Sequence, residues 1–382
     1  MQIHVVRPGD SLWSIAQAYR IPLYLLIQSN EVPNPAHLVV GQTLVIPTPG
    51  SSRPRTVADV GAYVDPRITG ADSVGEVDQH GDQLTYLPIF SYAVNPDGTL
   101  TPVVDQPLIN AAYRHRVAPL LTLTNFINGR FDRQLATTIF TNEALQEKVL
   151  DEVVAVMREK SYHGLNVDFE YLGAENRERY NQFLRRAAAK LKPGGFSLST
   201  ALAPKTSGSQ PGILYEGHDY AAQGQIVDFI FFMTYEWGWS GGPPRAVSPI
   251  NLVRQVLEYA ISVVPRNKIL MGIPLYGYDW TLPFVPGGRF AESISPQQAI
   301  ERAARYNSYI QYDRVAQAPF FFYTDENRRN HEVWFEDARS IQAKFDLVKT
   351  LGIRGFYYWV LGKDFPQNWL LIQDNFIVRK VV

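Results

Sequence analysis

The most constraining feature of this sequence is an alternation of strand-like and helix-like segments that begins near residue 57 and continues to the C-terminus. Short runs rich in Val, Ile, Phe and Tyr are separated by stretches in which apolar residues recur at helical spacing, a pattern typical of parallel β/α units. The predicted strands are Val57–Tyr63, Tyr86–Ser91, Ala118–Thr124, Gly164–Asp168, Ser197–Ala201, Phe229–Met233, Ile269–Gly272 and Gly355–Trp359. Eight such strands in about 320 residues predict an α/β fold, a (β/α)8 TIM barrel.

Two further segments stand apart from this repeat. Residues 276–335 are too long for a simple connection and predict a small α+β insertion subdomain, with a helix near Pro296–Tyr306 and aromatic strands at Tyr309–Tyr312 and Phe320–Tyr323. Before residue 48, a strand, two helices and a closing strand follow in a βααβ order, at Ile3–Val6, Leu12–Tyr19, about Pro22–Asn30 and Leu38–Ile46. The predicted domains are therefore a module at 1–48, a linker at 49–56 and the barrel at 57–382.

Composition excludes several classes of function. The chain has 36 lysines and arginines against 37 aspartates and glutamates, and its net charge of −1 gives no basis for binding nucleic acid or an anionic membrane. The absence of cysteine excludes disulfides and thiolate ligands. The 7 histidines lack metal-site spacing, so we expect no metal and no cofactor. No apolar run approaches a membrane span, no signal-peptide pattern is recognisable, and we expect a monomer.

The chemistry of the chain centres on the octet His163–Glu170, which reads His-Gly-Leu-Asn-Val-Asp-Phe-Glu. Successive strand residues point to opposite faces, so Asn166, Asp168 and Glu170 share one face. Buried carboxylates are costly unless they are paired or used. The octet ends the fourth predicted strand, and catalytic groups of TIM barrels gather at the carboxyl ends of the strands. We therefore expect Glu170 at the mouth of the barrel.

Other polar and aromatic residues are expected around the same mouth. They follow or close the first, third, sixth, seventh and eighth predicted strands, and comprise Tyr63, Asn125, Tyr235, Glu236, Trp237, Tyr276, Tyr278 and Trp359. A tyrosine at a strand end is more often packing than chemistry, but these residues converge on one opening. The joint placement predicts a functional site.

The N-terminal segment resembles a LysM module. The resemblance rests on His4–Ala16, Asn30 and Leu38–Pro47. It implies binding of N-acetylglucosamine-containing glycans, such as peptidoglycan or chitin, between the loop Gly9–Leu12 and the loop Asn34–Leu38. The implied contacts are Gly9, Asp10, Ser11 and Leu12. On the residues alone, Asp10 and Ser11 could equally be helix caps, and Trp13 could be a core residue.

The barrel segment resembles glycoside hydrolase family 18, the chitinase-like family. The family's D-G-x-D-x-D-x-E motif aligns on His163–Glu170, its Met-x-Tyr motif on Met233–Tyr235, and its barrel-floor tryptophan on Trp359. Together with the LysM-like module, the chain looks most similar to spore cortex-lytic N-acetylglucosaminidases. The resemblance implies an enzyme that cleaves β-1,4 bonds with retention, in which the substrate's own 2-acetamido oxygen is the nucleophile, and an association with the spore or cell wall.

The same resemblance implies roles for individual residues. Glu170 is the general acid and then the base, Asp168 orients the acetamide, and Tyr235 donates a hydrogen bond to its oxygen. Trp359 forms the apolar floor under the sugar. Weaker candidates for substrate contact are Asn125, Glu236, Trp237, Tyr278, Asn166 and Tyr63.

Two residues depart from the family motif. His163 replaces its first aspartate and Asn166 its second. An asparagine can still hydrogen-bond Asp168 but cannot take up a proton. We therefore expect Asn166 to shift the acidic limb of the pH profile, and His163 to be structural.

The residues leave alternatives open. A chitinase or an endo-N-acetylglucosaminidase acting on other glycans would carry the same motifs. A non-catalytic chitinase-like lectin would share the barrel, although such lectins usually lose the residue aligned on Glu170. A metal-dependent hydrolase is disfavoured by the scattered histidines.

Overall fold

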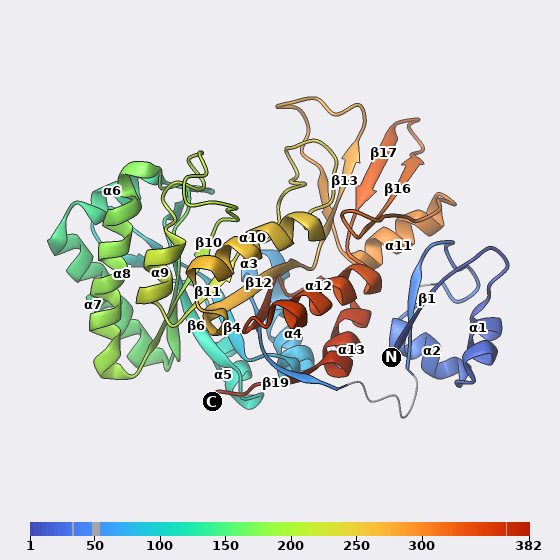
Figure 1. Cartoon of the computed structure of the whole chain (residues 1–382), viewed down its shortest axis with the longest axis horizontal. Helices are drawn as coiled ribbons and strands as arrows, with labels where there is room; N and C mark the ends of the chain where they lie inside the picture. Colours follow the sequence, from blue (N-terminus) through green and yellow to red (C-terminus); the bar gives the residue numbers. More distant parts are fainter. Residues whose placement is uncertain (33, 48–53, 364) are drawn as a thin grey trace.

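A closed barrel of parallel strands forms the centre of the molecule (Figure 1). The computed structural model describes residues 1–32, 34–47, 54–363 and 365–382, so residue 48 of the predicted module and residues 49–53 of the predicted linker lie outside the described part. The barrel strands are β3 Thr56–Ala62, β4 Tyr86–Val94, β6 Ala118–Thr124, β9 Gly164–Asp168, β10 Ser197–Leu202, β11 Phe229–Phe232, β12 Ile269–Pro274 and β18 Gly355–Trp359. The pairing of Gly61 with Tyr86 joins β3 to β4 and closes the barrel, which confirms the predicted fold.

Helices surround the barrel and connect its strands. They are α3 Pro66–Thr69, α4 Ser73–His80, α5 Gln106–Arg114, α6 Arg133–Phe140, α7 Glu143–Lys160, α8 Arg177–Leu191, α9 Tyr220–Ile226, α10 Ile250–Val263, α12 Ala338–Leu351 and α13 Pro366–Asn375. Side-chain caps determine where several of them begin. Asn142 accepts a hydrogen bond from the backbone N–H of Leu145 and starts α7. Short strands complete this part of the chain: β5 Leu100–Thr101, β7 Phe126–Ile127, β8 Arg130–Phe131 and β19 Phe376–Val378.

Alternation along the strands divides the core into two layers. Phe229 and Phe231 of β11 point into the barrel, where Phe231 packs edge-to-face on Tyr357 with ring centroids 4.5 Å apart. Their neighbours Ile230 and Phe232 belong to the outer layer between the strands and the helices. Such alternation is how a barrel fills its interior and still binds its helices. No helix among the described residues is long and apolar enough to span a membrane.

The insertion subdomain rises beside the barrel mouth between β12 and α12 (Figure 1). It consists of β13 Gly277–Thr281, β14 Glu292–Ile294, α11 Pro296–Arg305, β15 Gln311–Asp313, β16 Ala318–Thr324 and β17 Asn330–Trp334. The strands form an antiparallel sheet in the order β14-β13-β17-β16-β15. A capping box between Ser295 and Gln298 starts α11, whose apolar side packs on Phe321 and Val333 of the sheet.

The N-terminal module contains β1 Gln2–Val5, α1 Leu12–Tyr19, α2 Leu23–Asn30 and β2 Thr43–Ile46, with β1 antiparallel to β2. Its closing strand is shorter than the predicted Leu38–Ile46, because the chain turns at Gly41, which has a φ of 88°. The module packs directly against the rest of the chain. The N–H of Ile310 donates to the carbonyl of Val40 at 2.9 Å, and Arg339 donates to the carbonyl of Gly41 at 3.1 Å. A Cβ at Gly41 would lie 1.9 Å from the Ile310 carbonyl oxygen, so this contact requires glycine.

Candidate active site

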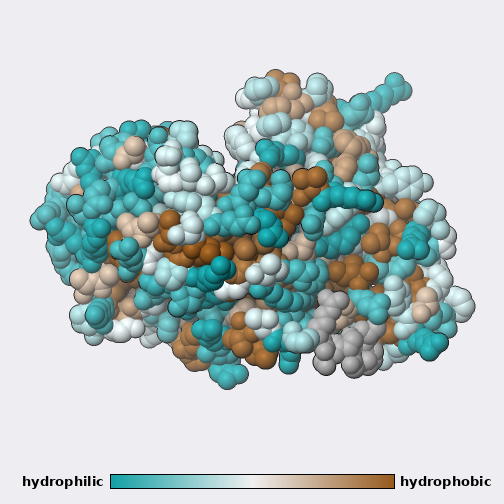
Figure 2. All heavy atoms as spheres, in the orientation of Figure 1, coloured by the Kyte–Doolittle hydropathy of each residue, from teal (hydrophilic) through white to brown (hydrophobic). Residues whose placement is uncertain are grey.

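A cleft of 690 Å³ opens at the carboxyl ends of the barrel strands. Figure 2 shows a notch in the upper surface of the molecule, between the insertion subdomain and the rest of the rim. Of the residues predicted for the site, the cleft brings together Tyr63, Asp168, Glu170, Tyr235, Glu236, Tyr276, Tyr278 and Trp359. Asn125, Asn166 and Trp237 do not line it.

Asp168 and Glu170 stand at the end of β9 and point into the cleft. Burial raises the pKa of Asp168. Burial also raises the pKa of Glu170, and the negative charges of Asp168 and Glu236 raise it further. Both effects favour the protonated form of the Glu170 carboxyl, which is the form that can donate a proton.

Asn166 lies beneath this pair and is fully buried. It accepts a hydrogen bond of 2.6 Å from the hydroxyl of Tyr63 and donates one of 3.0 Å to Ser199. A hydrogen bond between Asn166 and Asp168, which the sequence allows, is not among the contacts of the described residues, and the amide of Asn166 bonds Tyr63 and Ser199 instead. The Oδ1 atom of Asp168 is buried without a hydrogen-bond partner among the described residues, so it can accept an N–H from a ligand.

Asn125 acts on Glu170 from behind the cleft. Its side chain donates to the carbonyl of Glu170 and accepts from the N–H of Glu170, each at 3.0 Å. His218, which the sequence analysis missed, donates through Nε2 to the carbonyl of Phe169 at 2.9 Å and accepts through Nδ1 from the N–H of Ala203. The two peptide groups that flank the Cα atom of Glu170 are therefore held by the buried side chains of Asn125 and His218. Asn125 therefore bonds the backbone of Glu170 and does not line the cleft.

A third carboxylate faces the pair from the loop after β11. Glu236 accepts a hydrogen bond from Tyr276 and one of 3.0 Å from Tyr278, and burial raises its pKa. Beside it, the hydroxyls of Tyr235 and Tyr357 are 3.2 Å apart. The Tyr235 hydroxyl therefore stands at the edge of the acidic cluster, where it can donate to an incoming carbonyl oxygen.

Aromatic rings form the floor and walls of the cleft. Trp359 lies against Phe90 and Tyr63, with ring centroids 5.1 Å and 5.4 Å away. The walls include further aromatic residues that no sequence pattern marked: Phe126 and Phe131 of the short strands β7 and β8, and Tyr171, Tyr215 and Trp239 of loops. Trp237, predicted as a substrate contact, packs instead against the outer core. His163 precedes β9 at the opposite end of the barrel and is absent from the cleft lining.

The LysM residues fall into two groups. Gly9 and Ser11 are exposed, and Ser11 is the N-cap of α1. Asp10 accepts hydrogen bonds from His4 and from the N–H of Arg7, and the Arg7 bond is the main reason that its pKa is lowered. Leu12 is buried in the module core, so it offers no side-chain surface to a glycan.

Trp13 is 63% exposed, which overturns its interpretation as a core residue. The second predicted glycan loop borders the insertion subdomain. Asn34 and His37 line a hollow of 260 Å³ whose other wall is formed by α11, including Glu301. No cluster of His, Cys, Asp and Glu in the described residues could hold a metal ion.

Comparison with known proteins agrees with this geometry. The model of glycosyl hydrolases family 18 matches residues 78–364, and the LysM domain model matches residues 4–47. The chain belongs to glycosyl hydrolase family 18 and is a glycosidase that carries an N-terminal LysM domain.

Individual relatives extend the likeness over the whole chain. It is 44% identical to the cortical fragment-lytic enzyme of Bacillus subtilis, covering 100% of this chain and 99% of that protein. Among solved structures it resembles the spore cortex-lytic enzyme SleL of Bacillus megaterium, with a TM-score of 0.95, 43% identity and coverage of 100% and 99%. The Bacillus cereus spore cortex-lytic enzyme SleL follows with a TM-score of 0.93, 39% identity and 99% coverage of both chains.

Proposed function

We propose that this protein hydrolyses the peptidoglycan of the spore cortex as an N-acetylglucosaminidase. The main support for this proposal is the pair of acidic residues, Asp168 and Glu170, in the aromatic cleft. A buried oxygen of Asp168 has no hydrogen-bond partner among the described residues, and the pKa of Glu170 is raised. The likeness to cortex-lytic enzymes over the full length supports this substrate rather than another amino-sugar polymer.

The proposed chemistry follows from the positions of the side chains. Glu170 donates its proton to the glycosidic oxygen as the bond to the anomeric carbon breaks. The 2-acetamido oxygen of the same sugar attacks that carbon, giving a cyclic oxazolinium intermediate and the first half of a double inversion. Asp168 accepts the acetamide N–H and stabilises its developing positive charge. Glu170, now ionised, takes a proton from water, which attacks from the face that the leaving group vacated and restores the original configuration.

Two other residues complete this proposal. The Tyr235 hydroxyl orients the acetamide oxygen for attack. Trp359 supports the apolar face of the reacting sugar, since sugar rings present C–H groups that pack on indole. Both residues line the cleft beside the acidic pair.

The LysM module is proposed to hold the insoluble substrate, which would place the enzyme on the spore or cell wall. Its exposed Trp13 adjoins the predicted glycan loop Gly9–Leu12. Trp13→Ala should therefore weaken attack on intact sacculi and leave cleavage of soluble oligosaccharides unchanged. Equal losses on both substrates would refute this division of labour.

The function is tested by digesting purified spore-cortex peptidoglycan and chitin oligosaccharides with the wild type and with Glu170→Gln. Products are reduced with borohydride and identified by mass spectrometry. Fragments that end in reduced N-acetylglucosamine, absent from the variant digest, are the expected result. Cleavage of chitin alone would identify a chitinase, and cleavage of neither substrate would favour the lectin interpretation.

A further inference from the structure

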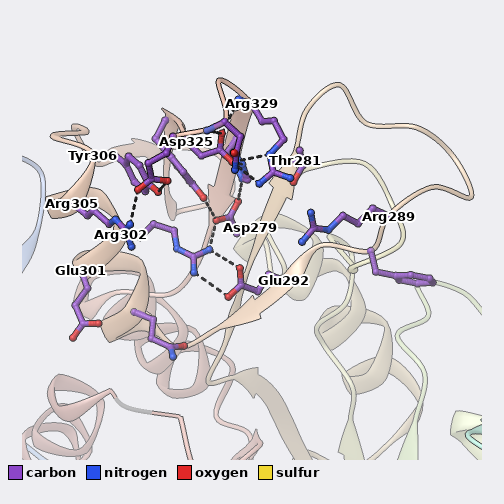
Figure 3. A pocket seen from close by; sticks show the side chains of 16 residues that line it. Asp279, Thr281, Arg289, Glu292, Glu301, Arg302, Arg305, Tyr306, Asp325 and Arg329 are labelled. Carbon is purple, nitrogen blue, oxygen red and sulfur yellow. Dashed lines mark hydrogen bonds and ion pairs between the residues drawn. The ribbon is translucent and has the colours of Figure 1, made fainter.

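A second cavity, of 530 Å³, lies on the insertion subdomain between α11 and the strands β13, β16 and β17 (Figure 3). It backs onto the catalytic cleft through β13, whose side chains alternate between the two spaces. Tyr278 lines the cleft, whereas its neighbour Asp279 lines the cavity. The rim between them is aromatic: Trp239 of the cleft meets Phe290 of the cavity edge-on, with ring centroids 6.2 Å apart.

The centre of this cavity is a paired and rigid ionic network. The carboxylate of Asp279 is buried and accepts hydrogen bonds from Arg302, from Tyr323 at 2.5 Å and from Nδ1 of His331 at 2.8 Å. Arg302 also bonds Glu292 through two nitrogens, at 2.9 Å and 3.0 Å. Such a bidentate pair holds both side chains in one geometry. The walls are thus preorganised, which reduces the entropy cost of binding.

Two opposite charges in the lining remain available. Arg289 and Glu301 are exposed, and no hydrogen bond or ion pair within 4 Å joins either of them to another residue that the structure describes. The hydrogen bonds from Arg302 lower the pKa of Glu292, and the charge of Arg289 helps to lower it. Figure 3 shows them on opposite sides of the cavity, Arg289 on the loop after β13 and Glu301 on α11. A ligand that spans the cavity therefore meets an exposed guanidinium at one end and an exposed carboxylate at the other.

A buried polar atom adds a third contact. His331 is 8% exposed, and its Nε2 atom has no hydrogen-bond partner in the described part of the chain, with Asp325 Oδ2 3.5 Å away. Nδ1 is hydrogen-bonded to Asp279, so Nε2 is the ring atom that can still form a hydrogen bond. It therefore suits a polar group of a ligand.

We propose that this cavity binds a short zwitterionic peptide, in which Arg289 takes a carboxylate, Glu301 takes a side-chain ammonium and His331 forms a hydrogen bond to the peptide backbone. The peptide branch of peptidoglycan, with its free carboxylates and a diamino acid, has this chemistry; this assignment of the source rests on the proposed function. A glycan strand in the cleft could send its branch over the Trp239–Phe290 rim into the cavity. The enzyme would then recognise peptide-bearing strands with a site separate from its catalytic residues.

The chemistry of the site is tested by calorimetry with the full-length protein and a synthetic tetrapeptide that contains a diamino acid. The wild type should bind this peptide about three- to fivefold more tightly than its side-chain acetylated form, as expected for one exposed ion pair. In Glu301→Gln this ratio should fall to about one, since the carboxylate that meets the ammonium is gone. Arg289→Gln should likewise abolish the preference for a free C-terminal carboxylate over the amide.

Controls use exposed residues of the same types outside the cavity, Glu159→Gln and Arg314→Gln, which should keep the wild-type ratios. Absence of tetrapeptide binding to the wild type, or unchanged ratios in both cavity variants, would overturn the proposal. These outcomes do not depend on whether the protein cleaves peptidoglycan.

A second arm tests the source of the peptide. Glycan strands of one length are prepared with their peptides attached and with the peptides removed by an amidase. Arg289→Gln should lower kcat/KM about three- to fivefold on the peptide-bearing strands alone. Equal effects on both strands would refute peptide recognition in the substrate. If the wild type cleaves neither kind of strand, the proposed function is refuted. The calorimetric result then decides alone whether the cavity binds the peptide.

Discussion

Asn125 offers a direct test of how the barrel positions its acid. Asn125→Ala removes the partners of both backbone groups of Glu170, each bonded at 3.0 Å. A buried backbone group without a partner costs about 1–3 kcal/mol, so the two groups predict a destabilisation of about 2–6 kcal/mol. If the freed peptide lets the Glu170 carboxyl move by about 1 Å, kcat should fall about 100-fold. KM should change little, because Asn125 does not line the cleft.

The assay combines steady-state kinetics on a soluble glycan with urea unfolding. Asn142→Ala is the matched control, because it removes the N-cap of α7, lies outside the cleft lining and should cost about 1 kcal/mol of stability with kcat unchanged. A kcat of Asn125→Ala close to that of the wild type would refute the positioning role. A loss of KM and kcat together would mean that Asn125 contacts substrate after all.

Three further outcomes are expected. Glu236→Gln removes a negative charge that raises the pKa of Glu170. The pKa of Glu170 should therefore fall, and the basic limb of the pH–rate profile should move to lower pH. A basic limb that does not move would contradict this coupling. The pKa of Glu170 is higher in the folded chain than in the unfolded chain, so the free energy of unfolding falls as the pH rises above the unfolded value. Glu170→Gln lacks this loss. In thermal melts it should be more stable than the wild type at pH 8, and the difference should vanish near pH 4. Lys344→Met leaves the buried carboxylate of Glu336, 2.8 Å from the lysine, without its partner. The free energy of unfolding, measured in urea, should fall by about 3–5 kcal/mol, and most of this loss should be recovered when Glu336→Leu is added.

The predicted strands at 118–124, 164–168 and 355–359 coincide with β6, β9 and β18, because each is a local run of apolar residues between clear breaks. The octet likewise placed Asp168 and Glu170 together, since alternation along one strand is a local property. The hydrogen-bond partner of Asn166 could not be predicted from such a local pattern. This partner, Tyr63, lies 103 residues earlier and contacts Asn166 only because the barrel is closed.

Loop residues show the same limit. Trp239 and Tyr215 line the cleft from connections whose path depends on what they pack against, and no spacing in the sequence marks them. Asn125 follows β6, as its place in the sequence predicts, but its side chain bonds the backbone of Glu170 and does not line the cleft. Which way a buried amide turns depends on the groups around it, and these come from distant parts of the chain.

The docking of the LysM module against the catalytic part of the chain affects how the proposed binding of glycans should depend on their length. A module on a free tether would let its bound glycan reach the active site over a range of distances. Here the contacts of Val40 and Gly41 with Ile310 and Arg339 hold the module against the catalytic part of the chain. The separation between the two proposed glycan sites, on the LysM module and in the cleft, is then fixed. Oligosaccharides shorter than that gap can occupy one site at a time, so affinity should rise in a single step, not gradually, once a strand is long enough to bridge both.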